Sequence, residues 1–124
     1  MFLGPNDGTR KGDIMTVAIQ EVGGIAVATP HVDRLDVRTV PEFRDEMNKV
    51  VENYTKVILN MDMINFVDST GLGALMSCIR RLNLKGGGLR MIALQQQPTA
   101  MFRLVRMHKV VDTFETLNDA VAGW

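Results

Sequence analysis

The sequence predicts an α/β fold in which one small domain carries a mixed sheet and about four helices. Three observations support this class. Short apolar, β-prone runs alternate with stretches whose apolar residues recur at helical spacing. Two β-prone runs stand together near the start, joined by a glycine pair, which predicts an antiparallel beginning. Each later run is separated from the next by a helical stretch, so the rest of the sheet is expected to be parallel with right-handed crossovers.

The first two strands are predicted as a hairpin. Residues 14–20 alternate between apolar and polar side chains, the glycines at 23–24 turn the chain, and residues 25–29 form a second β-prone run. The segment before them is rich in Gly, Asn and Asp. We therefore expect a flexible N-terminal lead or expression remnant over residues 1–13 and one folded domain over residues 14–124.

The first helix is predicted after Thr39, which forms a capping-box pattern with Glu42. Pro41 lies in the first turn, where the missing N–H costs nothing. An apolar stripe at helical spacing follows and comprises Phe43, Met47, Val50, Val51 and Tyr54. The next run, residues 56–61, is short and partly β-branched, so it is predicted as a buried strand.

The second helix is predicted to begin near the centre of the chain and to stop at the glycines of residues 86–88. Its apolar stripe comprises Leu72, Leu75, Met76, Ile79 and Leu82, with Arg80 and Arg81 off the stripe. Cys78 falls inside this pattern and is expected to be a small core residue.

The remaining elements follow the same alternation. Residues 89–94 are predicted as a strand, and residues 95–111 as a third helix that Pro98 opens and His108 nearly ends. A short extended piece at 113–116 and one or two final helical turns complete the chain.

Composition excludes several classes of function. The 14 basic and 14 acidic residues cancel, so there is no general basic footprint for nucleic acid. The single cysteine allows no internal disulfide, which suits a reducing compartment. The start of the chain lacks the pattern of a signal peptide, and no run approaches the roughly 18 apolar residues of a membrane span. A cytoplasmic protein is therefore expected.

A polar cluster opens the second helix. Asp68, Ser69 and Thr70 stand at its start, and Gly71 and Gly73 follow within the first turns. One such side chain suffices to cap a helix, so three in a row exceed what capping needs. The cluster could be a cap, a nucleophile, a phosphate cradle or a site that is itself modified.

The catalytic and metal hypotheses lack the residues they require. A nucleophilic Ser69 needs a positioned base, and neither His31 nor His108 has a sequence-level relation to it. No phosphate-binding loop lysine follows the glycines. Asp36, Asp62 and Asp68 are scattered rather than clustered as metal ligands. We therefore expect no enzyme activity, metal or cofactor.

The remaining hypothesis makes the hydroxyl a substrate of another protein. A phosphoserine adds roughly −1.5 to −2 charge units, and a helix N-terminus tolerates an anion. Asp68, and Asp36 if it lies nearby, would repel such a group. The surface charge would change sharply, and a partner docked there would be expelled.

These residues resemble the STAS family, specifically the bacterial anti-sigma factor antagonists. The signature stretch of that group is similar to residues 68–73, Asp-Ser-Thr-Gly-Leu-Gly. An earlier element of the family resembles residues 33–36, and its helix start resembles residues 41–43. The family's final helix, strand and closing helix resemble residues 104–121. Asp33 stands where the family usually has glycine, which places a further carboxylate near the loop.

The resemblance implies a phosphorylation switch that regulates transcription. It implies that Ser69 is phosphorylated by an ATP-dependent anti-sigma factor serine kinase, with Thr70 as the second-choice acceptor. The unphosphorylated form would bind that kinase and release a sigma factor, the phosphorylated form would let go, and a PP2C-type phosphatase would restore binding. The free protein is expected to be a monomer or weak dimer.

The resemblance also implies a loop and helix face that contact the partner. The residues expected there are Asp36, Asp68, Thr70, Gly71, Leu72, Gly73, Ser77, Arg80 and Arg81. The two aspartates would orient the loop, the glycines would lower bulk so that a partner can approach, and the helix would contribute its serine and arginines. An alternative is a STAS regulatory module of a non-sigma partner-switching, stressosome-like or transport assembly.

Overall fold

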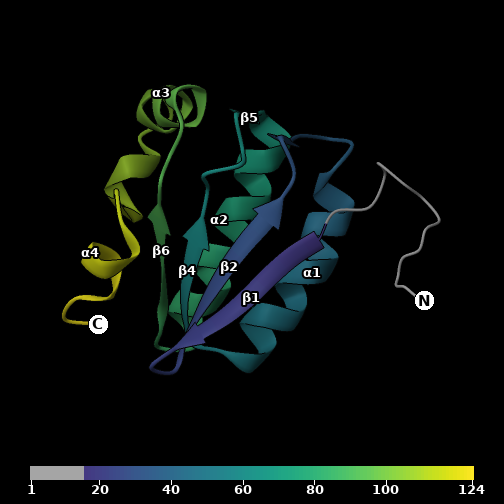
Figure 1. Ribbon diagram of the computed structural model, residues 1–124. Coiled ribbons are helices and arrows are strands. Elements are labelled where there is room, and N and C mark those ends of the chain that lie inside the picture. The colour runs from purple at the N-terminus through teal and green to yellow at the C-terminus, as the bar shows by residue number, and fades with distance from the viewer. Residues whose placement is uncertain (1–15) are drawn as a thin grey trace.

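The fold is centred on a five-stranded mixed sheet (Figure 1). A computed structural model describes residues 16–124, so the predicted flexible lead over residues 1–13 and the first two residues of the hairpin lie outside it. The strands, in their order across the sheet, are β1 (Thr16–Val22), β2 (Ile25–His31), β4 (Lys56–Asn60), β6 (Gly88–Ile92) and β7 (Asp112–Phe114). The β1–β2 pair is antiparallel and the other pairs are parallel, which confirms the predicted sheet.

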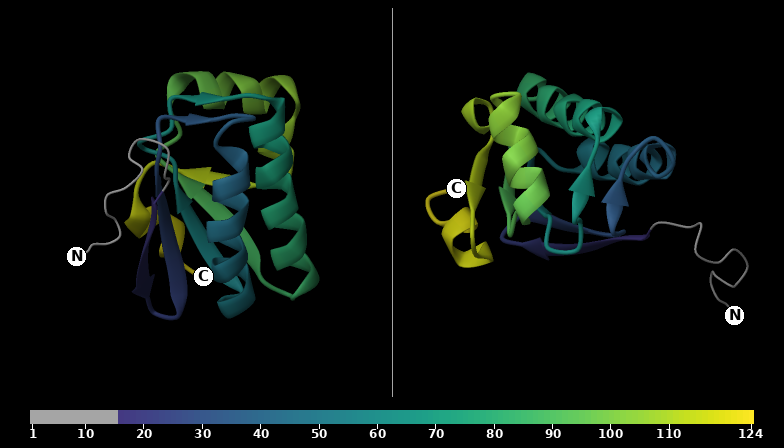
Figure 2. Two further views of the ribbon diagram at one scale, coloured as in Figure 1. Left: turned by 90° about the vertical axis from the view of Figure 1, so that its right-hand side faces the viewer. Right: turned by 90° about the horizontal axis from the view of Figure 1, so that it is seen from above.

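Four α-helices surround this sheet, as predicted. They are α1 (Val40–Asn53), α2 (Ser69–Leu84), α3 (Gln96–Leu104) and α4 (Leu117–Val121), and a 3₁₀ turn, η1 (Met107–Lys109), follows α3. Figure 2 shows α1 and α2 side by side on one face of the sheet and α4 on the opposite face. Helix α3 lies across the end of the molecule at which α2 begins.

The main core lies between the sheet and the helix pair α1–α2. The predicted α1 stripe is buried there through Phe43, Met47, Val50 and Val51. The α2 stripe contributes Leu72, Leu75, Ile79 and Leu82, and Cys78 is buried with them. Tyr54 lies just after α1 and is half-buried, with its hydroxyl 2.8 Å from a carboxylate oxygen of Glu21. A second cluster, Ile25, Val27, Ile58, Ile92 and Ala120, lies under α4.

The predicted capping box of α1 is wrong. Thr39 precedes the helix, but its hydroxyl makes no cap to the helix backbone. The hydroxyl instead donates to the carbonyl of Arg34 at 2.9 Å and accepts from the N–H of Asp36 at 3.0 Å. A cap requires the hydroxyl oxygen to accept from an N–H group of the first helical turn, and here that oxygen accepts from the N–H of Asp36 in the preceding turn instead. Pro41 does lie in the first turn of α1, as predicted.

The third helix differs from the prediction at both ends. It begins at Gln96, so Pro98 lies within its first turn rather than opening it. It stops at Leu104, because Arg106 adopts a left-handed conformation with φ of +63° and turns the chain into η1. His108 therefore lies in a separate turn.

Two strands of two residues each escaped the sequence prediction. These are β3 (Arg34–Leu35) and β5 (Phe66–Val67), which pair in parallel apart from the main sheet. Two residues are too short to show an alternating pattern. The pair is nevertheless important, because it joins the two loops that flank the start of α2.

Candidate functional site

Ser69 is the first residue of α2 and is exposed. It follows β5 after a single intervening residue, Asp68. Of the hydrogen bonds between residues 16–124, none involves the Ser69 hydroxyl. The side chain predicted to accept a phosphate is thus on the surface at a helix N-terminus.

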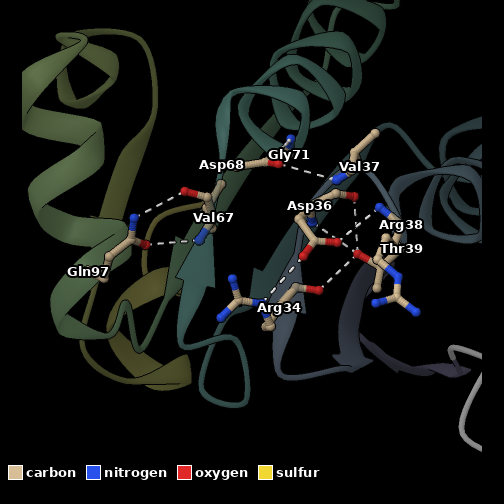
Figure 3. Close-up of polar contacts among 9 residues, drawn as sticks. All are labelled: Arg34, Asp36, Val37, Arg38, Thr39, Val67, Asp68, Gly71 and Gln97. Atoms are coloured by element: carbon tan, nitrogen blue, oxygen red, sulfur yellow. Dashed lines mark hydrogen bonds and ion pairs between the residues drawn. The ribbon is translucent and has the colours of Figure 1, made fainter.

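Asp68 is the N-cap of α2 and also ties two loops together (Figure 3). Its carboxylate accepts a hydrogen bond from the N–H of Gly71 at 2.8 Å. The other oxygen accepts from the N–H of Val37 at 3.3 Å, in the loop before α1. Its own N–H donates to the carbonyl of Leu35 at 3.1 Å. The backbone on the N-terminal side of Ser69 is therefore held from both neighbouring segments.

Further from the helix, hydrogen bonds also join the residues that directly precede β3 and β5. Asn65 donates its backbone N–H to the carbonyl of Asp33 at 2.7 Å. Its side-chain amide donates to the Asp33 carboxylate at 2.6 Å. The Asp33 carboxylate thus has a structural partner at the rim of the site.

Asp36 is partly shielded in the loop between β3 and α1. Its carboxylate accepts from the N–H of Arg38 at 3.0 Å and pairs with the Arg34 guanidinium at 3.4 Å. Partial desolvation acts to raise the pKa of Asp36, but the hydrogen bonds from Arg38 and Arg34 outweigh it and hold the pKa below its ordinary value. These contacts shape the turn, and the expected action of Asp36 on the Ser69 hydroxyl stays a prediction.

Arg34 covers the side of β5. Its guanidinium lies 4.1 Å from the ring centroid of Phe66, the geometry of a cation–π contact. It simultaneously pairs with Asp36. Arg34 thus joins the strand before Ser69 to the turn before α1.

The two glycines of the motif differ in environment. Gly71 is buried, and a Cβ placed on it would clash with the carbonyl oxygen of Leu35. Gly73 is exposed, and a Cβ there would meet nothing within 4 Å. The missing side chain of Gly71 therefore allows α2 to approach β3 closely. The expectation that the two glycines open the surface to a partner stays a prediction.

The other residues expected at the partner surface also range from buried to exposed. Leu72 is only 8% exposed and belongs to the core, and its expected contribution to a partner surface stays a prediction. Thr70 and Ser77 are half-buried, and Arg80 is exposed. Arg81 is half-buried and donates a hydrogen bond to the side chain of Asn48 on α1. Arg80 is thus the most accessible of the expected helix residues.

Two features of the site carry no clear sequence signal. Gln97 on α3 accepts from the N–H of Val67 at 2.9 Å and donates to its carbonyl at 3.1 Å (Figure 3). Val37, whose N–H binds Asp68, exposes 65% of its surface.

The site presents the Ser69 hydroxyl at the start of α2, where hydrogen bonds of Asp68 hold the backbone. His31 lies exposed at the end of β2, and neither it nor His108 hydrogen-bonds to Ser69 within the described part of the chain. Residues 16–124 contain no group of three or more acidic, histidine or cysteine side chains able to hold a metal ion. No helix in that range is both long and apolar enough to cross a membrane.

Comparison with known proteins finds one matching family model and similarity to anti-sigma factor antagonists. A family model described as the STAS domain matches residues 16–120. An anti-sigma-B factor antagonist from Staphylococcus aureus is 24% identical over 82 residues, which cover 65% of this chain and 76% of that protein.

Solved structures show the same fold. The crystal structure of an anti-sigma factor antagonist from Mycobacterium paratuberculosis superposes with a TM-score of 0.78 at 21% identity, covering 91% of this chain and 96% of that one. The phosphorylated form of the Bacillus cell fate determinant SpoIIAA gives a TM-score of 0.65 at 18% identity, covering 86% and 96%.

Proposed function

Since the chain belongs to the STAS domain family, we propose that it is an anti-sigma factor antagonist whose binding is switched off by phosphorylation of Ser69. Its partner is an anti-sigma factor that is also a serine kinase, and a PP2C-type phosphatase reverses the modification. The exchange takes place in the cytoplasm. The chain acts as a binding protein and catalyses no reaction itself.

The exposed hydroxyl of Ser69 at the first position of α2 carries this proposal. A kinase must reach the hydroxyl oxygen, and the site offers it without first breaking a hydrogen bond to another described residue. The likeness to anti-sigma factor antagonists supports the class of partner.

The charges around Ser69 support a switch that acts on the surface. A phosphate there would meet the positive end of the α2 dipole, which stabilises an anion. It would also lie next in sequence to the Asp68 carboxylate, which is held in place by Gly71 and Val37. The added negative charge would therefore be tolerated by the fold, while an acidic or close-fitting partner surface would be repelled.

The surface next to Ser69 suits the docking of a partner in the unmodified state. Val37 contributes an exposed aliphatic side chain from the loop that Asp68 holds. Gly73 and Arg80 extend the exposed surface along α2. Thr70 is half-buried, which makes it the poorer acceptor.

Binding and phosphorylation assays with the cognate anti-sigma kinase test the proposal. Mass spectrometry after incubation with ATP should place one phosphate on Ser69. Ser69→Ala should bind the kinase and resist release by ATP, while Ser69→Glu should bind at least tenfold more weakly, because like charges across an interface are strongly unfavourable. Asn118→Glu, at an exposed position of α4, is the control for a general effect of negative charge.

Three outcomes decide between the hypotheses. Phosphate found only on Thr70 or elsewhere would refute the assignment of Ser69. Equal affinities for the wild type, Ser69→Ala and Ser69→Glu would refute the charge switch. Phosphorylation-dependent binding to a protein that does not control a sigma factor would instead support the alternative role in a non-sigma partner-switching, stressosome-like or transport assembly.

A further inference from the structure

A cavity of about 420 Å³ lies between α3, η1 and the ends of β6 and β7. Its lining residues are Leu94, Thr99, Phe102, Arg103, His108 and Thr113. The cavity lies beside β6 and β7, which are neighbouring parallel strands. The volume falls in the usual range for small-molecule sites, roughly 300–1,000 Å³.

The lining combines an apolar floor with groups that attract an anion. Phe102 is buried, and Leu94 packs against the core, so together they form the apolar part. Thr99 and Thr113 contribute hydroxyls. Arg103 contributes a permanent positive charge and His108 an imidazole that can carry one.

Asp112 is the carboxylate next to the cavity in sequence. It precedes Thr113 in β7. Consecutive side chains of a strand point to opposite faces, so the Asp112 carboxylate is directed away from the face that Thr113 presents to the cavity. No carboxylate is among the lining residues.

We propose that this cavity binds a small organic carboxylate with an aliphatic or aromatic body. Arg103 and His108 pair with the carboxylate, the threonine hydroxyls donate to it, and Leu94 and Phe102 contact the apolar body. This site does not include Ser69, and the proposal is independent of the phosphorylation switch.

Three probes separate the two parts of the proposed recognition. Octanoate has both the carboxylate and the apolar body, 1-octanol lacks the charge, and acetate lacks the body. Each is titrated into the ¹⁵N-labelled full chain and followed by NMR chemical shifts. Octanoate should shift the amide signals of the cavity residues and bind at least tenfold more tightly than either of the other probes.

Substitutions then assign the contacts. Arg103→Gln should weaken octanoate binding on the order of tenfold, because it removes a charge-assisted hydrogen bond. His108→Gln provides a second, independent variant, and it should also weaken octanoate binding, because it removes the imidazole from the cavity lining. Arg80→Gln removes an exposed cation of α2 outside the cavity and should leave binding unchanged.

The result can contradict the proposal in clear ways. Equal binding of octanol and octanoate would show that the charge has no role. Shifts that map outside the cavity, or no binding at millimolar octanoate, would show that the cavity is not a carboxylate site. Equal losses for Arg80→Gln and Arg103→Gln would show only a general response to net charge and would overturn the assignment. The dispersion of the NMR spectrum verifies that each variant is folded.

Discussion

The side-chain amide of Gln97 pairs with both backbone groups of Val67, accepting from the N–H at 2.9 Å and donating to the carbonyl at 3.1 Å. Val67 belongs to β5, whose other neighbour is β3. One amide of α3 thereby takes the place of a further strand. It also connects α3 to the residue two positions before Ser69.

Gln97→Glu should destabilise the domain by about 1–3 kcal/mol, because a carboxylate cannot donate to the Val67 carbonyl and would face it with like charge. Gln96→Glu is the matched control. Gln96 is exposed in the same first turn of α3, so both variants gain the same favourable interaction with the helix dipole. Urea denaturation measures both. Equal stabilities for the two variants would contradict the role given to the paired amide.

Gly71→Ala and Gly73→Ala should have opposite effects although both residues lie in α2. The methyl group at residue 71 would clash with the Leu35 carbonyl oxygen and should cost about 2–3 kcal/mol. The methyl group at residue 73 meets nothing within 4 Å and should stabilise the helix by up to about 1 kcal/mol. Thermal unfolding of the two variants provides the comparison. A neutral Gly71→Ala would show that α2 does not need its close approach to β3.

Asp68→Ala should lower the free energy of unfolding by about 1–2 kcal/mol, because it removes a helix cap. It also leaves the N–H of Val37 without its carboxylate acceptor. Asp68→Asn keeps an acceptor oxygen and should cost less. Asp62→Ala, at an exposed turn position, is the control for loss of one negative charge. If Asp62→Ala were as destabilising as Asp68→Ala, the loss would come from charge rather than from the cap.

Cys78 should make the domain less stable at alkaline pH. Burial raises the pKa of its thiol from the ordinary 9.0 to about 11, and the nearby Arg81 and Arg44 offset only part of that effect. Below pH 9 both the folded and unfolded chains keep the proton. Between pH 9 and 11 the unfolded chain loses it first, so the free energy of unfolding falls, by about 2 kcal/mol over the whole range.

Urea denaturation of the wild type and of Cys78→Ala, under reducing conditions at pH 8 and pH 10.5, isolates this contribution. The other titratable groups are the same in both proteins, so their contributions cancel in the comparison. The advantage of the wild type over Cys78→Ala should shrink by more than 1 kcal/mol at the higher pH. A constant difference between the two proteins would show that the thiol does not titrate differently on unfolding.

Much of the fold follows from patterns that extend over several residues. The apolar stripe around Phe43 and Met47 fixes the inner face of α1, and the glycines at 23–24 fix the hairpin turn. Such signals are local and repeated, so they survive the influence of tertiary contacts. The same is true of Cys78, whose burial follows from its place in the α2 stripe.

What escaped prediction depends on single contacts between distant segments. The pairing of Gln97 with Val67 spans 30 residues and has no pattern of its own. Thr39 matches a capping sequence, yet its hydroxyl oxygen accepts from the N–H of Asp36 rather than from the helix. Arg106 ends the third helix in a conformation that usually requires glycine. Within the site, Gly71 and Gly73 look alike in sequence, and only the position of Leu35 distinguishes them.

The two hydrogen bonds that fix the Asp68 carboxylate have a consequence for how a signal is stored. They hold the backbone around Ser69 without using its hydroxyl. Under the proposed function, phosphorylation and dephosphorylation of Ser69 would therefore need no rearrangement of this loop. The kinase and the phosphatase could recognise the same loop conformation. The two signalling states would then differ in the covalent modification of Ser69 rather than in the conformation of the backbone.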